Sequence, residues 1–238
     1  MARSPSSGGR DFPRLLPPPG GLSGGGPGPQ SEGLRRGPQP GIPARRTGGG
    51  AMENPAGVDW SRIPVPVEDG LAAHLPGMTL PSVRLAGTDG SVVDLSKLPG
   101  RSVIYIYPMT GRPDIPAPDG WDTIPGARGC TLQSCAFRDH FATLRDLGVR
   151  HLFGLSVQGT AYQKEAADRL HLPFPLLSDE GFALAGALKL PTLTVHGQRL
   201  LKRMTIVAKD GRIEHVFYPV FPPDRNADRV IEWLQDNP

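Results

Sequence analysis

The only two cysteines of this 238-residue chain lie five positions apart, at Cys130 and Cys135. Cys130 follows a glycine and opens a stretch with helical patterning. A helix N-terminus presents unpaired backbone N–H groups and the positive end of the helix dipole, and both stabilise a thiolate relative to a thiol. Because the thiolate is the nucleophilic form of cysteine, this placement favours thiol chemistry. The alternative is a pair of small core residues without chemistry.

The spacing of the two cysteines limits what they can do. Residues five apart on a helix are turned by about 140° and raised by about 7.5 Å, whereas a disulfide needs Cα atoms roughly 4.4–6.8 Å apart. Cys130 and Cys135 therefore cannot bond unless the first helical turn unwinds. Two thiols with His140 on another face also fall short of the four ligands of a typical zinc site. We expect neither a metal nor another cofactor.

The elements that position Cys130 follow from the apolar pattern. Residues 102–107 (SVIYIY) predict a strand buried on both faces, and residues 131–147 predict a helix that ends at Gly148. Residues 151–157 predict the next buried strand. Strand, helix and strand in succession indicate parallel pairing, and ligands in such sheets sit at the carboxyl ends of the strands, where Cys130 falls.

The remaining patterns complete an α/β domain. The further expected elements are a hairpin of residues 82–85 and 92–95, a helix at 162–170, a strand at 174–177, a helix at 181–188, a hairpin of residues 203–208 and 213–220, and a final helix that Asp224 caps and that ends near Leu234. We place this domain at residues 76–238, behind an N-terminal extension at residues 52–75.

Residues 1–51 differ from the rest of the chain. They contain 14 Gly and 10 Pro and no apolar periodicity, which predicts disorder. They also carry seven Arg and two acids, a net charge of +5. The other 19 basic and 21 acidic residues give the folded part a net charge of −2, so nothing there suggests nucleic-acid binding.

The tail has two interpretations. It is either a flexible basic arm or sequence foreign to the natural protein, whose start we then expect at Met52. No apolar run has the length of a secretory signal core or of a membrane span, so we expect no membrane association. Two cysteines without an export signal point to the reducing cytoplasm, where such a pair is more often redox-active than structural.

Residues 129–141 (GCTLQSCAFRDHF) closely resemble the active-site helix of peroxiredoxins of the bacterioferritin-comigratory, or Q, type. The resemblance covers most of residues 76–238. Its further motifs are Tyr107-Pro108, Leu176-Leu177-Ser178-Asp179, and Arg203-Met204-Thr205 followed by Asp210-Gly211. The Cys-Thr-x-x-x-Cys segment together with the later Arg-x-Thr hairpin makes the likeness specific.

The resemblance implies a thioredoxin-like fold and a thiol-dependent peroxidase that acts on hydrogen peroxide or organic hydroperoxides. Cys130 would be the peroxidatic cysteine that becomes a sulfenic acid, and Cys135 the resolving cysteine. A thioredoxin-like reductant would reopen the resulting disulfide. Arg203 would lie near the thiolate, stabilising it and donating hydrogen bonds to the peroxide oxygens.

The chain departs from the family pattern in two places. Thr123 stands where the family has Pro, and Ala127 where it has Thr or Ser, so the hydroxyl that would bind peroxide is absent from its usual position. Residues 109–129 form a long insertion rich in Pro, Gly and Asp. Thr131 and the Arg128 backbone are candidate replacements for substrate binding, as are Thr110 and Thr123.

Two other classes of function remain open on the sequence. One is a thioredoxin-fold disulfide switch or redox sensor that keeps the cysteines without peroxidase activity, because the hydroxyl at position 127 is gone. The other is a binding domain of the same fold with inert cysteines. Fast oxidation of Cys130 by micromolar peroxide separates the peroxidase from both.

Overall fold

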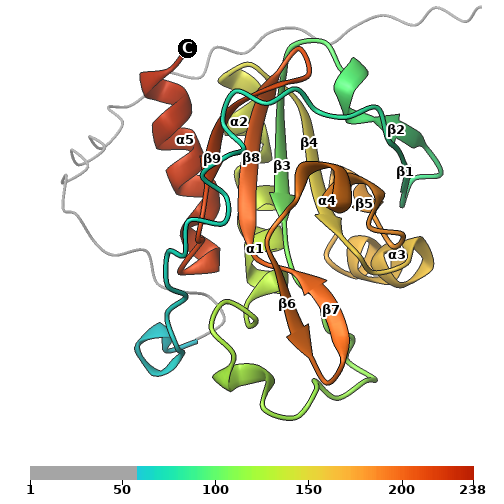
Figure 1. Cartoon of the computed structure of the whole chain (residues 1–238), viewed down its shortest axis with the longest axis vertical. Coiled ribbons are helices and arrows are strands. Elements are labelled where there is room, and N and C mark those ends of the chain that lie inside the picture. The colour runs from blue at the N-terminus through green and yellow to red at the C-terminus, as the bar shows by residue number, and fades with distance from the viewer. Residues whose placement is uncertain (1–57) are drawn as a thin grey trace, which may run out of the picture. The chain divides into compact units, whose positions relative to one another are not determined.

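A computed structural model describes residues 58–238, and the predictions for residues 1–51 and for a start at Met52 lie outside the described residues. The central sheet has seven strands in the order β2-β1-β5-β4-β3-β8-β9 (Figure 1). Their bounds are β1 Arg84–Gly87, β2 Val92–Asp94, β3 Arg101–Ile106, β4 Val149–Ser156, β5 Leu176–Ser178, β8 Met204–Lys209 and β9 Arg212–Phe217. The pairs β3–β4 and β4–β5 are parallel, and the other pairs are antiparallel.

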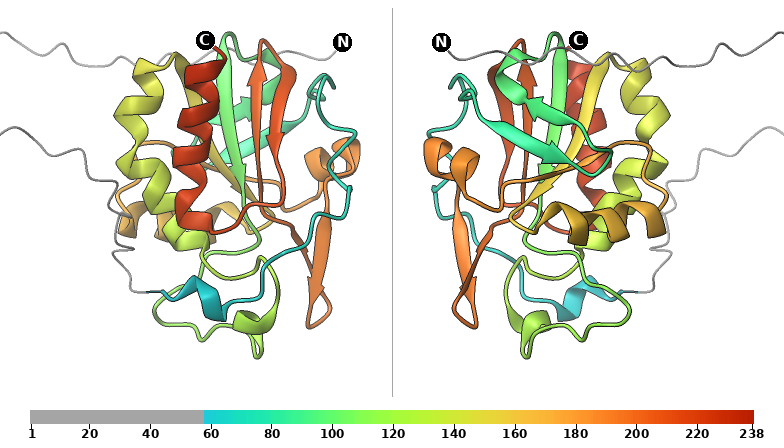
Figure 2. Two further views of the ribbon diagram at one scale, coloured as in Figure 1. Left: turned by 90° about the vertical axis from the view of Figure 1, so that its left-hand side faces the viewer. Right: turned by 90° about the vertical axis from the view of Figure 1, so that its right-hand side faces the viewer.

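Five α-helices accompany the sheet in the described part of the chain. They are α1 Cys130–Asp139, α2 Phe141–Asp146, α3 Thr160–Arg169, α4 Ala183–Leu188 and α5 Asn226–Asp236. Figure 2 shows α1, α2 and α5 on one side of the sheet and α4 on the other. A separate hairpin of β6 (Thr192–Val195) and β7 (Gln198–Leu201) projects beyond the sheet.

Strand β3 divides the core between the two faces of the sheet. Its side chains alternate, so Val103 and Tyr105 face the helices α1, α2 and α5, while Ile104 and Ile106 face α4. All six residues of the strand are buried, as its continuous apolar run predicts. On the helical side, the ring of Tyr105 stacks on Phe137 of α1 with centroids 4.5 Å apart, which holds α1 against the sheet about two turns beyond Cys130.

Two predictions about individual elements are wrong, and one element was missed. The single helix expected at residues 131–147 is two helices that break at His140, whose ring pairs with Asp228 of α5 at 3.0 Å. The β6–β7 hairpin was not predicted. It turns through His196 and Gly197, both at positive φ, and His is not a residue that marks such turns. Asp224 does not cap α5, because it lies in a preceding 3-10 turn, Pro223–Arg225, and accepts a hydrogen bond from Trp60.

Candidate active site

Cys130 is the first residue of α1, and only 4% of it is exposed. Gly129 precedes it at a φ of 98°, in the left-handed region that favours glycine. A Cβ at Gly129 would lie 2.4 Å from Cγ of Pro223 and 2.8 Å from the ring of Trp60. Position 129 therefore requires glycine both for its backbone conformation and for the close approach of these two side chains.

Arg203 lies against the Cys130 sulfur, although the two are 73 positions apart in the sequence. Arg203 is 3% exposed, and its Nη2 donates to Sγ of Cys130 at 3.1 Å. The same Nη2 donates to the carbonyl oxygens of Gly126 at 3.2 Å, Ala127 at 3.0 Å and Arg128 at 2.9 Å. The fold thus brings together two of the residues that the resemblance selects, and it ties the guanidinium to the loop that leads into α1.

A buried polar network extends from Arg203 away from the sulfur. Nη1 of Arg203 donates to Oε1 of Gln133, whose Nε2 donates to Oδ1 of Asn226 at 2.9 Å. Thr205 donates to the same Asn226 oxygen at 2.6 Å. Sequence analysis missed Gln133 and Asn226, although Gln133 lies three residues after Cys130, on the same face of α1. Asn226 has no local signal that could have identified it.

Cys135 lies on a different face of α1 from Cys130. It is partly buried, and both cysteines are free thiols. Burial raises the pKa of the Cys135 thiol, while the neighbouring charges of Arg138 and Arg169 act in the opposite direction. The two cysteines therefore have different surroundings: Cys130 faces a buried guanidinium, and Cys135 sits in a half-buried site where the thiol form is favoured.

The other candidate residues are distributed around this centre. Thr131 is partly buried in the first turn of α1. Arg128 turns its side chain to Asp122 and presents its carbonyl to Arg203. The hydroxyls of Thr110 and Thr123 are bound elsewhere, to Gln158 at 3.1 Å and to the Gly120 carbonyl at 2.7 Å.

Position 127, where the family hydroxyl is absent, is occupied by a fully buried alanine. Its side chain belongs to a small apolar cluster with Trp121, Val195 and Leu200, which packs the 109–129 insertion against the β6–β7 hairpin. Its carbonyl accepts a hydrogen bond from the Cys130 thiol at 3.5 Å. Position 127 thus contacts the sulfur through its backbone rather than through its side chain.

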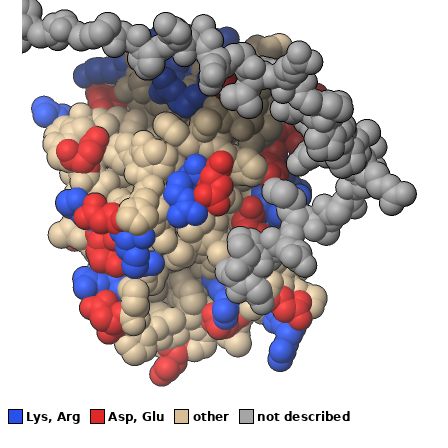
Figure 3. Space-filling view, turned by 180° about the vertical axis from the view of Figure 1, so that it is seen from behind, with Lys and Arg blue, Asp and Glu red and all other residues tan. Residues whose placement is uncertain are grey.

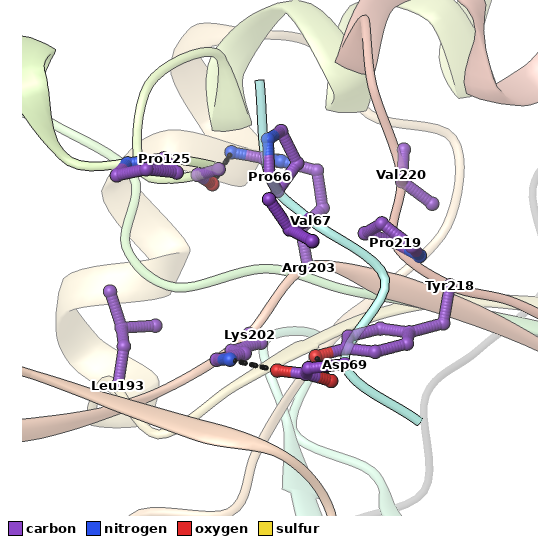
Figure 4. A pocket seen from close by; sticks show the side chains of 11 residues that line it. Pro66, Val67, Asp69, Pro125, Leu193, Lys202, Arg203, Tyr218, Pro219 and Val220 are labelled. Atoms are coloured by element: carbon purple, nitrogen blue, oxygen red, sulfur yellow. Dashed lines mark hydrogen bonds and ion pairs between the residues drawn. The ribbon is translucent and has the colours of Figure 1, made fainter. Parts of the chain in front are cut away.

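A cavity of about 240 Å³ lies beside the guanidinium of Arg203 (Figure 4). Its walls are mostly apolar, and its lining residues are Pro66, Val67, Asp69, Pro125, Gly126, Leu193, Lys202, Arg203, Tyr218, Pro219 and Val220. Asp69 accepts hydrogen bonds from Lys202 at 2.6 Å and from the Tyr218 hydroxyl at 2.8 Å. These contacts lower the pKa of Asp69 to about 2.

The surface charge and the metal-binding potential of residues 58–238 bear on other kinds of site. Acidic and basic residues are interspersed over much of the face shown in Figure 3. Within residues 58–238, no group of three or more His, Cys, Asp or Glu side chains could hold a metal ion. The same residues include no helix long and apolar enough to cross a membrane.

Comparison with known proteins places the site in a family. The Redoxin family model matches residues 75–231, which include both cysteines and Arg203. The chain belongs to the redoxin family. Within that family it is a peroxiredoxin of the Q type, since a peroxiredoxin Q of Sedum lineare is 30% identical over 160 residues, covering 67% of this chain and 77% of the relative. The peroxiredoxin Q of japonica rice is also 30% identical, over 67% of this chain.

This redoxin spans slightly less than two thirds of the rice relative, 66% of its length. Solved structures share its fold at lower identity. The peroxidoxin BcpB of Mycobacterium tuberculosis has a TM-score of 0.56 at 23% identity and covers 68% of this chain and 97% of its own. A peroxiredoxin Q of Xylella fastidiosa has a TM-score of 0.55 at 19% identity, with coverages of 68% and 95%. The predicted thioredoxin-like α/β fold is confirmed.

Proposed function

We propose that this redoxin is a thiol peroxidase that reduces hydrogen peroxide or organic hydroperoxides. The observation that carries the proposal is the contact of 3.1 Å between Nη2 of Arg203 and Sγ of Cys130 in a buried site at a helix N-terminus. A cationic donor at this distance stabilises a thiolate relative to a thiol, and burial strengthens the interaction by excluding water. Membership of the peroxiredoxin Q group supports the same activity.

The first step is attack of the Cys130 thiolate on one oxygen of the hydroperoxide. The S–O bond forms as the O–O bond breaks, and the second oxygen leaves as water or alcohol after it takes up a proton. Nε of Arg203 is buried and has no hydrogen-bond partner among residues 58–238. Since it belongs to the same planar guanidinium that contacts the sulfur, it is the donor that we assign to the peroxide.

The second step is condensation of the Cys130 sulfenic acid with the Cys135 thiol, which forms a disulfide and releases water. Both residues lie in α1, five positions apart, so the first turn of this helix has to unwind before their sulfurs can meet. A thioredoxin-like dithiol would then reduce the disulfide by thiol–disulfide exchange. Thr131 and the Arg128 backbone remain our candidates for further contacts with the substrate.

The direct test is rapid mixing of the reduced protein with micromolar hydrogen peroxide, with acid quenching and mass spectrometry of both cysteines. The wild type is expected to form the sulfenic acid at Cys130 and then the intramolecular disulfide. Cys130→Ser is expected to react slowly or not at all. Slow oxidation of the wild type by peroxide would instead favour the redox switch, if reagents such as diamide that oxidise thiol pairs still form the disulfide.

We also propose a cytoplasmic location for the protein, because two reduced cysteines are suited to a reducing compartment. Several relatives carry the word chloroplastic in their names. Fluorescence microscopy of the tagged full-length chain in its native cell would distinguish the two compartments.

A further inference from the structure

Residues 58–69, which we call the strap, lie before the part of the chain that matches the redoxin family. One end of the strap is anchored by Trp60, whose indole N–H donates to Oδ2 of Asp224 at 2.9 Å and whose ring meets Phe221 edge-on at 5.8 Å. The other end is anchored by Asp69, through its bonds to Lys202 and Tyr218. Both anchors are tertiary contacts with residues more than 130 positions away.

Between its anchors the strap passes over the loop that enters α1. The ring of Trp60 lies against Gly129, and Pro66 lies against Gly126, where it would be 3.6 Å from an added Cβ. The carbonyl oxygens of residues 126–128 point to Arg203. This loop is therefore held by Arg203 through its carbonyls and by the strap through van der Waals contacts. Figure 4 shows Pro66 of the strap on the same side of the cavity as Pro125 and Arg203.

The strap can hold its position at a low entropic cost. Prolines at positions 64 and 66 restrict the backbone of the sequence IPVPV before folding, so less conformational freedom is lost when it docks. Val65 and Val67 are 61% and 80% exposed. Since so little of these two side chains is buried, Val65 and Val67 contribute little to the docking of the strap, whereas Trp60, Pro66 and Asp69 contact distant parts of the chain.

We propose that Trp60 is a positioning residue that controls how fast the oxidised Cys130 forms its disulfide with Cys135. This inference rests on the proposed function. The first turn of α1 must unwind for the two sulfurs to meet, and the turn begins at Gly129, against which Trp60 and Pro223 pack. While the strap is docked, this contact stabilises the wound helix and slows the condensation.

The delay decides between two fates of the sulfenic acid. Condensation with the Cys135 thiol gives the disulfide and water. Reaction with a second hydrogen peroxide molecule transfers one more oxygen to sulfur and gives a sulfinic acid and water. A docked strap lengthens the life of the sulfenic acid and so favours the sulfinic acid at high peroxide. The strap thereby determines the peroxide concentration at which the protein is inactivated.

The test measures the two oxidation steps separately in the full chain. The variants are Trp60→Ala, which removes the packing on Gly129, and Asp69→Asn, which weakens the far anchor. The matched control is Asp114→Asn, which removes a carboxylate from the exposed ion pair with Arg112 outside the strap. Acid-quenched samples taken after mixing with hydrogen peroxide give the rates of sulfenic acid, disulfide and sulfinic acid formation by mass spectrometry.

We expect disulfide formation to be on the order of tenfold faster in Trp60→Ala, equivalent to about 1.4 kcal/mol in the barrier, and a smaller acceleration in Asp69→Asn. The fraction of sulfinic acid at millimolar peroxide should be lowest in Trp60→Ala and intermediate in Asp69→Asn. The control should match the wild type in both measurements. Disulfide formation that is equally fast or slower in both strap variants would overturn the inference. If Trp60→Ala does not fold, Asp69→Asn carries the test.

A failure of the proposed function gives a different result. If the wild type shows no fast oxidation by peroxide, the strap can still be tested with diamide, which oxidises two thiols to a disulfide without a sulfenic acid. That reaction needs the same unwinding of α1. Faster disulfide formation by diamide in Trp60→Ala would support the role of the strap, and an unchanged rate would overturn it.

Discussion

Replacing Arg203 by methionine tests the contact on which the proposed chemistry depends. Methionine keeps an unbranched side chain but removes the charge and the Nη2 donor that lies 3.1 Å from Sγ of Cys130. Hydrogen bonds to charged groups are worth about 1.5–3 kcal/mol. If this stabilisation is present in the transition state, its loss lowers the rate of peroxide attack by roughly 10- to 150-fold.

The same substitution also affects stability, and the experiment has to separate the two effects. Without the guanidinium, the buried Oε1 of Gln133 and the carbonyls of residues 126–128 lose a donor. An unsatisfied buried polar group costs about 1–3 kcal/mol. We therefore expect a lower midpoint of urea unfolding, and the rate should be measured well below the temperature at which the variant unfolds.

The assay is the second-order rate of Cys130 oxidation by hydrogen peroxide, measured by rapid mixing with quenching and mass spectrometry. Arg112→Met is the matched control, because Arg112 lies in an exposed ion pair with Asp114. Arg203→Lys should fall between the wild type and Arg203→Met, since an ammonium keeps the charge but cannot reproduce the planar set of donors. A folded Arg203→Met variant that reacts within threefold of the wild type would refute the assignment of Arg203.

Three further predictions follow from the site and its surroundings. Cys135→Ser should leave the rate of the first oxidation of Cys130 within about twofold of wild type and abolish the intramolecular disulfide. Mass spectrometry of the unreduced protein checks both results. If thioredoxin-dependent turnover persists in this variant, the resolving thiol is not Cys135. Burial lowers the pKa of His215, which stacks on Trp233. As the pH falls below about 6.5, the imidazole of His215 is therefore protonated more readily in the unfolded chain than in the folded protein, which favours unfolding. Urea unfolding should show a loss of stability from pH 7.5 to pH 5 that is smaller in His215→Gln, and an equal loss in both proteins would contradict the assignment. Ala127→Ser should lower the free energy of unfolding by about 1–3 kcal/mol because its hydroxyl enters an apolar cluster. It should not accelerate peroxide reduction, and a faster reaction would show that the hydroxyl reaches the sulfur.

The parts of the fold that were predicted correctly are those specified by local patterns. The continuous apolar run at residues 102–107 corresponds to the fully buried β3. The β8–β9 hairpin turns at Asp210 and Gly211, both at positive φ, where the Asp-Gly pair predicted a tight turn. The glycine before Cys130 marks the start of α1. In each case a few neighbouring residues determine the backbone conformation.

The parts that were missed depend on contacts between distant residues. The break at His140 accompanies a pairing with Asp228 on α5, 88 positions away. The bond from Gln133 to Asn226 joins residues 93 positions apart, and the bond from Trp60 to Asp224 joins residues 164 apart. A pattern read along the chain carries no information on such pairs, so neither the polar network behind Arg203 nor the strap over Gly129 could be predicted from sequence.

The absent hydroxyl at position 127 makes the proposed reaction depend more heavily on Arg203. In the thiol form, Cys130 donates to the Ala127 carbonyl, and Arg203 donates to the same oxygen at 3.0 Å. Once the thiol ionises, its sulfur and this carbonyl are both acceptors, and Nη2 of Arg203 lies within hydrogen-bond distance of each. The guanidinium thus offsets the electrostatic repulsion between the thiolate and the buried carbonyl oxygen of Ala127.

In the proposed reaction the peroxide also accepts its hydrogen bond from the guanidinium of Arg203. Nη2 donates hydrogen bonds to the sulfur and the carbonyls, and Nη1 donates to Gln133. Nε is the one guanidinium nitrogen that has no hydrogen-bond partner in residues 58–238. The side chain at position 127 packs into an apolar cluster and cannot share the developing charge, so one guanidinium must hold both the nucleophile and the oxygen that it attacks. The loop, Gln133 and Asn226 are therefore as important to the proposed chemistry as the charge of Arg203, because they fix the plane in which its donors point.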